Sequence, residues 1–424
     1  MTPSPKPPQP TPTQSMADPK NLIVILGGSY GGISTAHYLL KHVTPHLPSH
    51  KVILASTSSE ALCRPACPRA LLSDDYFPQT KLFVDIAAQF AHYPPEIFEF
   101  VHGTATDLDA ALHTVTISLA DTTAAATVTL TYHALIIATG ALAVSPLLGL
   151  NSDDAPALRA AWAAFRARLP SAKHIVIAGG GPSGVEVAGE IGEHLNGVRS
   201  WWWPGAKQAA YPRVAITLVA DSPTVLPQLR PVLGRAAQGY LARVGVDVVC
   251  GTRVVASAPA ADGGWDVKLS RGDTLHADEY IPCVGTAANT SFVREGDKAR
   301  LLAADGRVRT DPGTLRTEVK GVYAVGDVSD FARPAIHNVL AAVPVLCANV
   351  RRDLVRLQGG NDGGDRLFVE EKREMQLVPV GWSKGVGAMM GFRVPSVVVW
   401  LIKGRDYWLW TTGGLWSGRQ WAKA

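Results

Sequence analysis

The sequence predicts an α/β fold with two Rossmann-like units and a small C-terminal α+β region. Two glycine-rich turns, about 150 residues apart, indicate this fold. The first turn, Gly27 to Gly32, follows the apolar run 21–26 and leads into a helix-like run. The second turn, Gly179 to Gly184, follows the apolar run 174–178 in the same way. A strand, a glycine turn and a helix in this order form a dinucleotide-binding unit, so two such units predict two dinucleotides.

The glycines of the second turn have separate structural roles. Gly179 adopts backbone angles that a side chain would disfavour, Gly181 lets the backbone approach a pyrophosphate, and Gly184 lets the helix pack closely on the strand. The phosphate then binds unpaired N–H groups at the positive end of the helix. The first turn departs from this pattern, because Ser29 occupies the second glycine position. A serine is small enough for the turn, but its side chain makes a close approach of the backbone to the pyrophosphate less favourable.

Length and composition limit the class of protein. A chain of 424 residues predicts two or three domains. Its content of 47% hydrophobic and 18% charged residues is typical of a packed globular protein. The formal net charge of +4, without a dense stripe of lysine and arginine, gives no basis for nucleic-acid binding.

The cysteines form neither a disulfide framework nor a zinc-binding pattern, and we predict no bound metal. The five cysteines are Cys63, Cys67, Cys250, Cys283 and Cys347. Three residues separate Cys63 from Cys67, unlike the pairs of flavin disulfide reductases, so two unconnected thiols are favoured over a redox pair. The odd count, without a signal-peptide pattern, predicts a reducing environment and a cytoplasmic protein.

After the first turn, the pattern predicts a helix over 33–43 and a strand over 51–55. In a dinucleotide-binding fold this second strand ends in an acid that binds ribose hydroxyls, whereas Ser56 stands there. Its hydroxyl can form the hydrogen bond without charge assistance, so we expect a weaker contact. Arg69 follows a proline-rich segment and is either a solvated surface arginine or a contact for a cofactor or a flanking carboxylate.

Further strands are predicted at 98–106, 113–118 and 129–138. The last of them ends in Thr139-Gly140, where the backbone is expected to cross between domains. A helix over about 155–168 then leads to the second turn.

The second unit continues with a helix at 231–244. An insertion at 194–212 contains Trp201–Trp203, which are expected to pack over a loop or to contact a partner or membrane. The strands predicted in this unit are 214–219, 246–249, 265–270 and 279–285.

The chain is expected to return to the first unit through the strand 321–327, which ends in Gly326-Asp327, and a helix at about 336–356. The last sixty residues are rich in tryptophan, and the run Val394–Ile402 is apolar but only nine residues long. Lys403 and Arg405 follow it. This composition fits a segment at a membrane interface or an apolar substrate slot, or a strand and helix packed on the first unit. No run of 18 apolar residues predicts a spanning helix.

Taken together, these motifs resemble the apoptosis-inducing-factor-like flavoproteins, which include the ferroptosis-suppressor quinone reductase and fungal relatives. That group lies within the pyridine-nucleotide-disulfide-reductase superfamily. The resemblance covers about residues 21–424. It rests on both glycine turns and on the motifs Ala66–Arg69, Ala138–Gly140, Gly326-Asp327, Gly385–Gly387, Gly391-Phe392 and Leu401–Asp406.

The resemblance implies that the first unit binds FAD. The turn would hold its pyrophosphate, Ser56 the ribose, Ala105 the adenine by backbone contacts, and Asp327 the ribityl or pyrophosphate region. Thr139 and Gly140 would lie beside the isoalloxazine. The FAD-contacting residues expected in this way are Gly27, Ser29, Gly31, Gly32, Ser56, Arg69, Ala105, Thr139, Gly140, Gly326 and Asp327.

The second unit would bind NADH or NADPH at Gly179, Gly181 and Gly184. Glu186 follows the last glycine by two residues, and it either points towards the nicotinamide as the catalytic residue or is an acid favoured at a helix start. Asp221, just after the strand 214–219, weakly favours NADH.

The resemblance implies an FAD-dependent NAD(P)H oxidoreductase that transfers a hydride from the nicotinamide to the flavin and then electrons to a quinone-like acceptor. The alternatives are a flavin oxidoreductase for a specialised metabolite and a redox-sensing or death-signalling flavoprotein with little turnover. The expected partners are a small-molecule acceptor, no nucleic acid, and a peripheral membrane through the C-terminal region. We expect a disordered tail at 1–20, an FAD-binding domain at 21–150 and 287–358, an NAD(P)H-binding domain at 151–286 and a C-terminal region at 366–424.

Overall fold

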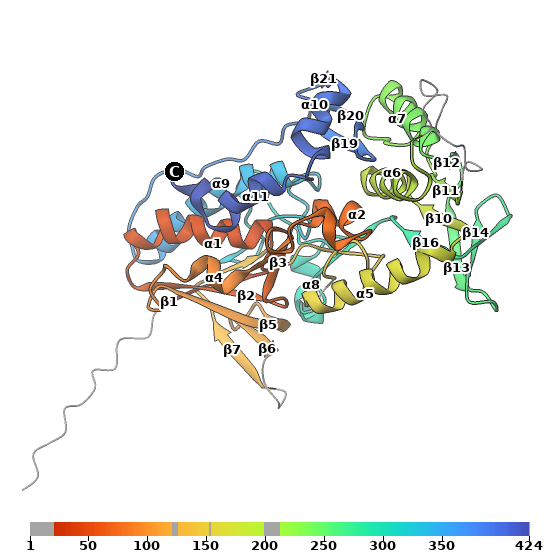
Figure 1. The fold of residues 1–424 in the computed structure, drawn as a ribbon. Coiled ribbons are helices and arrows are strands. Elements are labelled where there is room, and N and C mark those ends of the chain that lie inside the picture. The colour runs from red at the N-terminus through yellow and green to blue at the C-terminus, as the bar shows by residue number, and fades with distance from the viewer. Residues whose placement is uncertain (1–20, 121–125, 152–153, 199–212, 424) are drawn as a thin grey trace, which may run out of the picture.

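Two mainly parallel sheets, each covered by helices, lie side by side in the computed structural model (Figure 1). The structure describes residues 21–120, 126–151, 154–198 and 213–423. The predictions made for the tail 1–20 and for Trp201–Trp203 lie outside these residues.

The first sheet has seven strands in the order β18-β8-β1-β2-β5-β6-β7. The five strands from β18 to β5 are parallel, whereas β6 and β7 continue β5 as an antiparallel ribbon. The strands are β1 (Asn21–Leu26), β2 (His50–Ser56), β5 (Phe98–Asp109), β6 (Thr114–Leu119), β7 (Thr127–Thr131), β8 (Ala134–Ile137) and β18 (Val322–Ala324). Because β18 joins β8, a segment from the last third of the chain completes a sheet that starts at residue 21.

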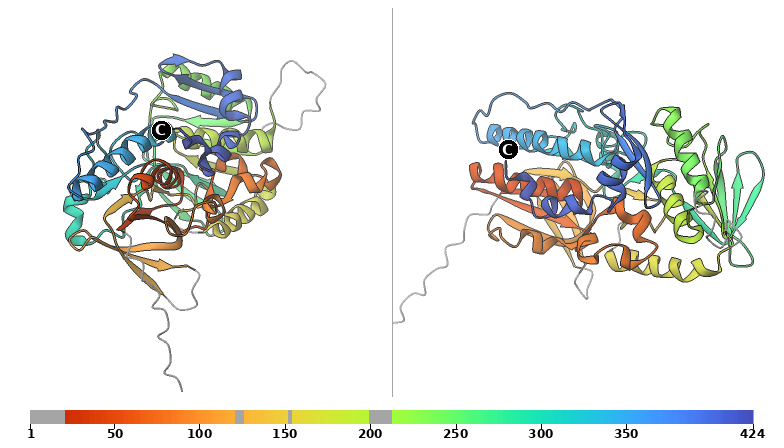
Figure 2. Two further views of the ribbon diagram at one scale, coloured as in Figure 1. Left: turned by 90° about the vertical axis from the view of Figure 1, so that its left-hand side faces the viewer. Right: turned by 45° about the horizontal axis from the view of Figure 1, so that its top comes forward.

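Both faces of the parallel part of the first sheet are buried, as expected for parallel strands. Ile23 and Ile25 of β1 pack beneath the helices α1 (Tyr30–His42) and α9 (Ile336–Leu357). Val24 and Leu26 alternate with them and pack into a second cluster on the opposite face. Figure 2 shows α1 and α9 lying next to each other on one side of the sheet.

The second sheet has the order β12-β11-β10-β16, and all four strands are parallel. The strands are β10 (His174–Ala178), β11 (Ala215–Val219), β12 (Val246–Val249) and β16 (Glu279–Pro282). Helices α6 (Pro182–Asn196) and α7 (Pro231–Arg243) pack against it. An antiparallel sheet of β13 (Val254–Pro259), β14 (Trp265–Leu269) and β15 (Thr274–Ala277) lies beside β16.

Two chain crossings connect the sheets. The strands β9 (Ala141–Ala143) and β17 (Thr286–Ala288) pair antiparallel, one leading out of the first sheet and one returning to it. Helix α5 (Ala155–Arg168) follows the outward crossing, and α8 (Glu295–Leu301) follows the return. Shorter elements after β2 are β3 (Glu60–Leu62), α2 (Cys67–Ala70), α3 (Gln79–Leu82), β4 (Phe83–Asp85) and α4 (Ile86–Phe90).

The C-terminal region packs over both units. Its three-stranded sheet comprises β19 (Gln376–Val380), β20 (Lys384–Met389) and β21 (Phe392–Arg393). The apolar run around Val397 then forms α10 (Ser396–Val399) and a π-helical turn (Trp400–Gly404), and α11 (Leu409–Trp416) returns to α1. No helix in the described part of the chain has the length and apolar character that crossing a bilayer requires.

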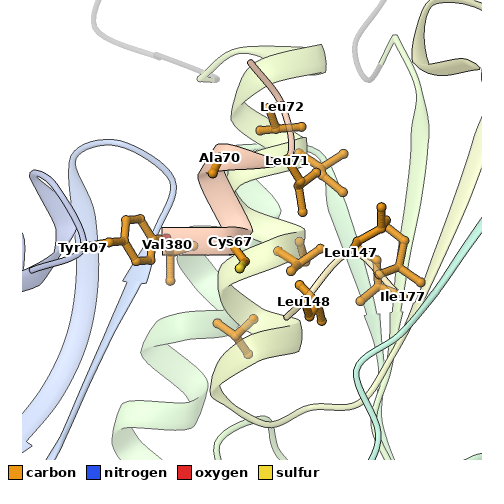
Figure 3. Close-up of a cluster of buried hydrophobic side chains, with 14 of the residues drawn as sticks. Cys67, Ala70, Leu71, Leu72, Leu147, Leu148, Ile177, Val380 and Tyr407 are labelled. Atoms are coloured by element: carbon orange, nitrogen blue, oxygen red, sulfur yellow. The ribbon is translucent and has the colours of Figure 1, made fainter. Parts of the chain in front are cut away.

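One apolar cluster joins α2, the second sheet and the C-terminal region. Figure 3 shows Cys67 of α2 and Leu71, directly after that helix, between Ile177 of β10 and Val380 of β19, with Tyr407 beside them. These side chains are buried, so the short helix α2 of the first unit is fixed against the second unit and the C-terminal region.

Candidate functional site

The first glycine turn connects β1 to α1 in the geometry that a dinucleotide requires. Gly27 has a φ of +115°, and a β-carbon there would overlap the carbonyl oxygen of Ala138. A β-carbon on Gly32 would overlap the carbonyl oxygen of Gly27, so the helix can approach the strand only without a side chain. Ser29 has extended backbone angles (φ −126°, ψ −159°) and an exposed side chain at the start of α1. A serine fits this position without strain.

The other residues expected near FAD lie on or beside neighbouring strands. Ser56 ends β2 and is buried, and its hydroxyl occupies the space that a β-carbon on Gly28 would need. Gly31 packs against Val325, just after β18. Ala105 lies in β5 beside a β-bulge, and its side chain is partly exposed.

The segment that leaves β8 meets the segment that leaves β18 at the same edge. Gly140 has a φ of +69°, and Thr139 donates a hydrogen bond to the carbonyl of Asn289 over 2.7 Å, which joins the two crossings. Gly326, with a φ of +92°, turns the chain into Asp327. Burial raises the pKa of Asp327, opposed by the nearby Arg64 guanidinium. Within the described residues its carboxylate accepts no hydrogen bond, so it is free to receive hydroxyl donors.

The second turn repeats this geometry between β10 and α6. Gly179 has a φ of +117°, and a β-carbon there would overlap the carbonyl oxygen of Cys283. A β-carbon on Gly184 would likewise overlap the carbonyl oxygen of Gly179. No described atom lies within 4 Å of the β-carbon position of Gly181, which leaves that backbone open to a ligand. Asp221 is exposed just beyond the carboxyl end of β11.

Glu186, just after the first turn of α6, pairs with Lys403 of the C-terminal region. The Nζ of Lys403 donates to Oε1 of Glu186 over 2.6 Å and to the carbonyl of Leu377 over 3.2 Å. Both charged side chains are buried. Burial raises the pKa of Glu186, and the neighbouring ammonium opposes that effect. Lys403 follows the apolar run for which a membrane interface, a substrate slot or packing on the first unit was expected, and its side chain points inward.

Arg69 is not the solvated surface arginine of the first alternative, because only 1% of its surface is exposed. The flanking carboxylate of the second alternative is Glu190, one helical turn after Glu186. Two hydrogen bonds join them, Nε to Oε2 at 2.9 Å and Nη2 to Oε1 at 2.8 Å. The hydroxyl of Tyr407 donates to the same carboxylate over 2.8 Å. Direct contact of Arg69 with a cofactor stays a prediction.

Cys63 and Cys67 are free thiols buried beside the first turn. Burial raises the pKa of Cys63 to about 11 and that of Cys67 to about 12, so neither forms a thiolate near neutral pH. The hydroxyl of Tyr30 donates to Cys63 Sγ over 3.5 Å. The raised pKa values disfavour the thiolate that a redox pair needs.

The two strand–turn–helix units agree with the family to which the sequence belongs. Residues 21–345 match the family described as pyridine nucleotide-disulphide oxidoreductase. The chain belongs to this family. It is 55% identical over 421 residues to oxidoreductase phnG from Penicillium herquei, with 96% of this chain and 98% of that protein covered.

More distant relatives cover most of the chain. Oxidoreductase ptaL from Pestalotiopsis fici is 31% identical, with 90% of this chain and 95% of that protein covered. Ferroptosis suppressor protein 1 from Mus musculus is 25% identical, with 91% of this chain and 92% of that protein covered. The prediction of an oxidoreductase similar to that group is confirmed.

Solved structures share the fold. The water-forming NADH oxidase from Lactobacillus brevis bound to NADH superimposes with a TM-score of 0.62 at 17% identity, covering 87% of this chain and 74% of that one. Reduced Bacillus anthracis CoADR-RHD gives a TM-score of 0.63 at 18% identity, and this chain spans only 61% of its length. The predicted fold class is confirmed.

FAD and a nicotinamide dinucleotide are the cofactors of this family and of this protein. The chain fits both groups, because neither turn has room for a side chain at the two glycines that bring the helix onto the strand. These are Gly27 and Gly32 in the first turn and Gly179 and Gly184 in the second. At the first site Asp327 adds a half-buried carboxylate that pairs with no residue in the described part of the chain, and at the second Gly181 adds open backbone.

Proposed function

We propose that this NAD(P)H-dependent oxidoreductase passes electrons through FAD to a quinone-like acceptor. The observation that carries the proposal is the pair of glycine turns, each shaped to admit a pyrophosphate at a helix start. When bound, the two cofactors supply hydride transfer from nicotinamide to flavin and an electron pair for the acceptor.

The residues of the first turn would hold the FAD pyrophosphate on the N–H groups at the start of α1. Asp327 would accept hydrogen bonds from ribityl hydroxyls, which suits a carboxylate whose described surroundings leave its oxygens unpaired. Thr139 is held by the carbonyl of Asn289, so the backbone at Gly140 has a fixed position for the ring system.

Glu186 is our candidate for the side chain nearest the nicotinamide. It lies two residues after Gly184, and Lys403 holds its carboxylate in one orientation. The buried ion pair keeps the site polar while excluding water, which suits hydride transfer between two stacked rings. We infer a preference for NADH from the exposed carboxylate of Asp221, which would bind the ribose hydroxyls and repel a 2′-phosphate.

A small acceptor is favoured over a thiol relay. Cys63 and Cys67 are buried and have raised pKa values, so a thiol step between flavin and substrate is disfavoured. The quinone-like character of the acceptor rests on the family resemblance and on the apolar C-terminal region.

That region also supports a peripheral membrane contact. Val397, Leu401 and Trp410 are each more than half exposed, and Arg405 is exposed beside them. An apolar group with an adjacent cation suits a lipid headgroup boundary.

An acceptor profile tests the proposal. Purified protein is supplied with NADH under anaerobic conditions, and benzoquinones, naphthoquinones, ferricyanide and non-quinone aromatic ketones are compared as acceptors. We expect the uncharged quinones to give the highest kcat/KM. A preference for a non-quinone ketone would favour a flavin oxidoreductase for a specialised metabolite instead.

A further inference from the structure

Arg69 contacts three segments that are far apart in the sequence. From α2 it pairs with Glu190 of α6, and its Nη1 and Nη2 donate to the carbonyls of Arg405 (3.2 Å) and Gly381 (3.4 Å). Its guanidinium carbon also lies 4.7 Å from the ring centre of Trp382 and 4.9 Å from that of Tyr407. Every one of these contacts is to the second unit or the C-terminal region.

The contacts of Arg69 lead directly to the Glu186 site. The carboxylate that Arg69 orients accepts the hydroxyl of Tyr407 over 2.8 Å. The backbone N–H of Tyr407 in turn bonds to the carbonyl of Lys403 over 2.6 Å, and Lys403 pairs with Glu186. Arg69 thus contacts the middle of the turn 403–407, at the Arg405 carbonyl, and its C-terminal end, at the Tyr407 ring.

The stability of the fold alone gives little reason for a buried ion pair such as that of Arg69 and Glu190. Replacing a buried ion pair by uncharged residues of similar size is often neutral or stabilising, whereas removing one partner is strongly destabilising. Arg69 and Glu190 have at most 1% of their side chains exposed. A guanidinium offers a planar set of donors that reaches four acceptors at once, which a hydrophobic side chain cannot do.

We propose that Arg69 is a positioning residue: it fixes the segment 400–409 against α6 and thereby holds Lys403 on Glu186. This inference rests on the proposed role of Glu186 in the nicotinamide site. It gives Arg69 a role different from direct cofactor contact.

Two variants separate positioning from simple stabilisation. Arg69→Met leaves Glu190 buried without a counter-charge and lowers the melting temperature. Arg69→Met/Glu190→Gln removes both charges and keeps an amide oxygen for the Tyr407 hydroxyl, so it should recover most of that loss. Neither variant retains the donors to the carbonyls of Arg405 and Gly381.

The first measurement is amide hydrogen exchange of the FAD-loaded protein, which requires no turnover. We expect faster exchange over 400–409 in both variants, with the strands of the two sheets still protected. Arg159→Met is the matched control, since Arg159 also makes two hydrogen bonds to a carboxylate, that of Glu60, without touching this segment. It should leave the exchange of 400–409 unchanged.

The second measurement is the rate of flavin reduction by NADH in a single turnover. We expect both Arg69 variants to be slower by about tenfold, because a displaced lysine disturbs the site geometry.

If the double variant recovers melting temperature, exchange and rate together, Arg69 only stabilises the fold and the proposal is wrong. If Arg69→Met does not fold, Tyr407→Phe tests the connection from Glu190 to the segment 400–409, because it removes the hydroxyl that donates to Glu190. Unchanged exchange over 400–409 in Tyr407→Phe would contradict the positioning role. A wild-type protein that NADH does not reduce contradicts the proposed function, while the exchange result still decides on the positioning role.

Discussion

Gly184 of α6 lies against the carbonyl oxygen of Gly179, so closely that a β-carbon on Gly184 would overlap that oxygen. Gly32 and Gly27 have the same relationship in the first turn. In both units the helix therefore starts directly on the end of the preceding strand, and its first N–H groups face the space above the sheet.

Gly184→Ala and Gly181→Ala should have different consequences. Gly184→Ala forces the helix from the strand, and we expect a loss of about 3 kcal/mol in the free energy of unfolding. Gly181 has open space at its β-carbon position, so Gly181→Ala should keep its stability and instead weaken NADH binding. Urea denaturation and an NADH titration followed by tryptophan fluorescence measure the two effects. Equal loss of stability in both variants would contradict this assignment of the turn.

Asp221→Ala should relax the preference for NADH. Removing the carboxylate at the end of β11 removes both a ribose acceptor and the repulsion of a 2′-phosphate. We expect the ratio of kcat/KM for NADPH to that for NADH to rise about tenfold. Asp247→Ala in β12, another exposed carboxylate of the same sheet, is the control and should leave the ratio unchanged. A ratio unaffected by Asp221→Ala would show that other residues select the coenzyme.

His37 should make the fold sensitive to acid. Its Nε2 bonds to the carbonyl of Trp416 over 2.8 Å and its Nδ1 to the hydroxyl of Tyr93 over 3.1 Å. Because a carbonyl only accepts, Nε2 carries the proton and Nδ1 accepts from Tyr93. Burial is the main cause that lowers the pKa of His37 to about 4, and the neighbouring Lys41 and His92 lower it further.

The neutral form of His37 is therefore favoured in the folded protein. Its contribution to stability is fully present above pH 6.5 and is lost as pH falls towards 4, because the unfolded chain takes up the proton first. We expect this one group to account for about 3 kcal/mol across that range. His37→Gln, which does not titrate, should show a correspondingly flatter stability profile between pH 7 and 4 in chemical denaturation. Parallel profiles of the two proteins would exclude His37 as the cause.

Leu401→Glu/Trp410→Glu should reduce binding to anionic vesicles. Both side chains are exposed, so the charges should be tolerated by the fold, unlike a truncation that would remove the buried Lys403 and Tyr407. We expect co-sedimentation with phosphatidylserine-containing liposomes to fall about tenfold or more. Val255→Glu, an exposed apolar position on β13, should have no effect. Wild-type protein that stays in the supernatant would contradict the membrane contact.

The sequence predicted the parts of the site that are formed by residues close together in the chain. A strand followed by a glycine turn and a helix is determined by residues within about twenty positions of one another, so both turns were identified. The helix α9 was expected at about 336–356 and spans Ile336–Leu357 for the same reason.

The partners of the charged residues could not be predicted in this way. Arg69 and Glu190 are 121 positions apart, and Glu186 and Lys403 are 217 apart, so no periodicity relates them. A partial signal was present, because Glu186, Glu190 and Glu193 repeat at helical spacing and must share one face of α6. An acidic stripe on a helix that is otherwise small and apolar indicated that cations would face it. The residues around Lys403 left a membrane interface, an apolar slot and a packed segment all open, and none of these alternatives identified Glu186 as its partner.

The most direct test of the proposed function is anaerobic reduction of the purified yellow protein. NADH should bleach the flavin absorbance, and an added soluble quinone should restore it with one quinone reduced per flavin. Cys63→Ser/Cys67→Ser should behave in the same way, because no thiol relay is expected. A flavin that NADH does not bleach, or that a quinone does not reoxidise, would contradict the proposed function.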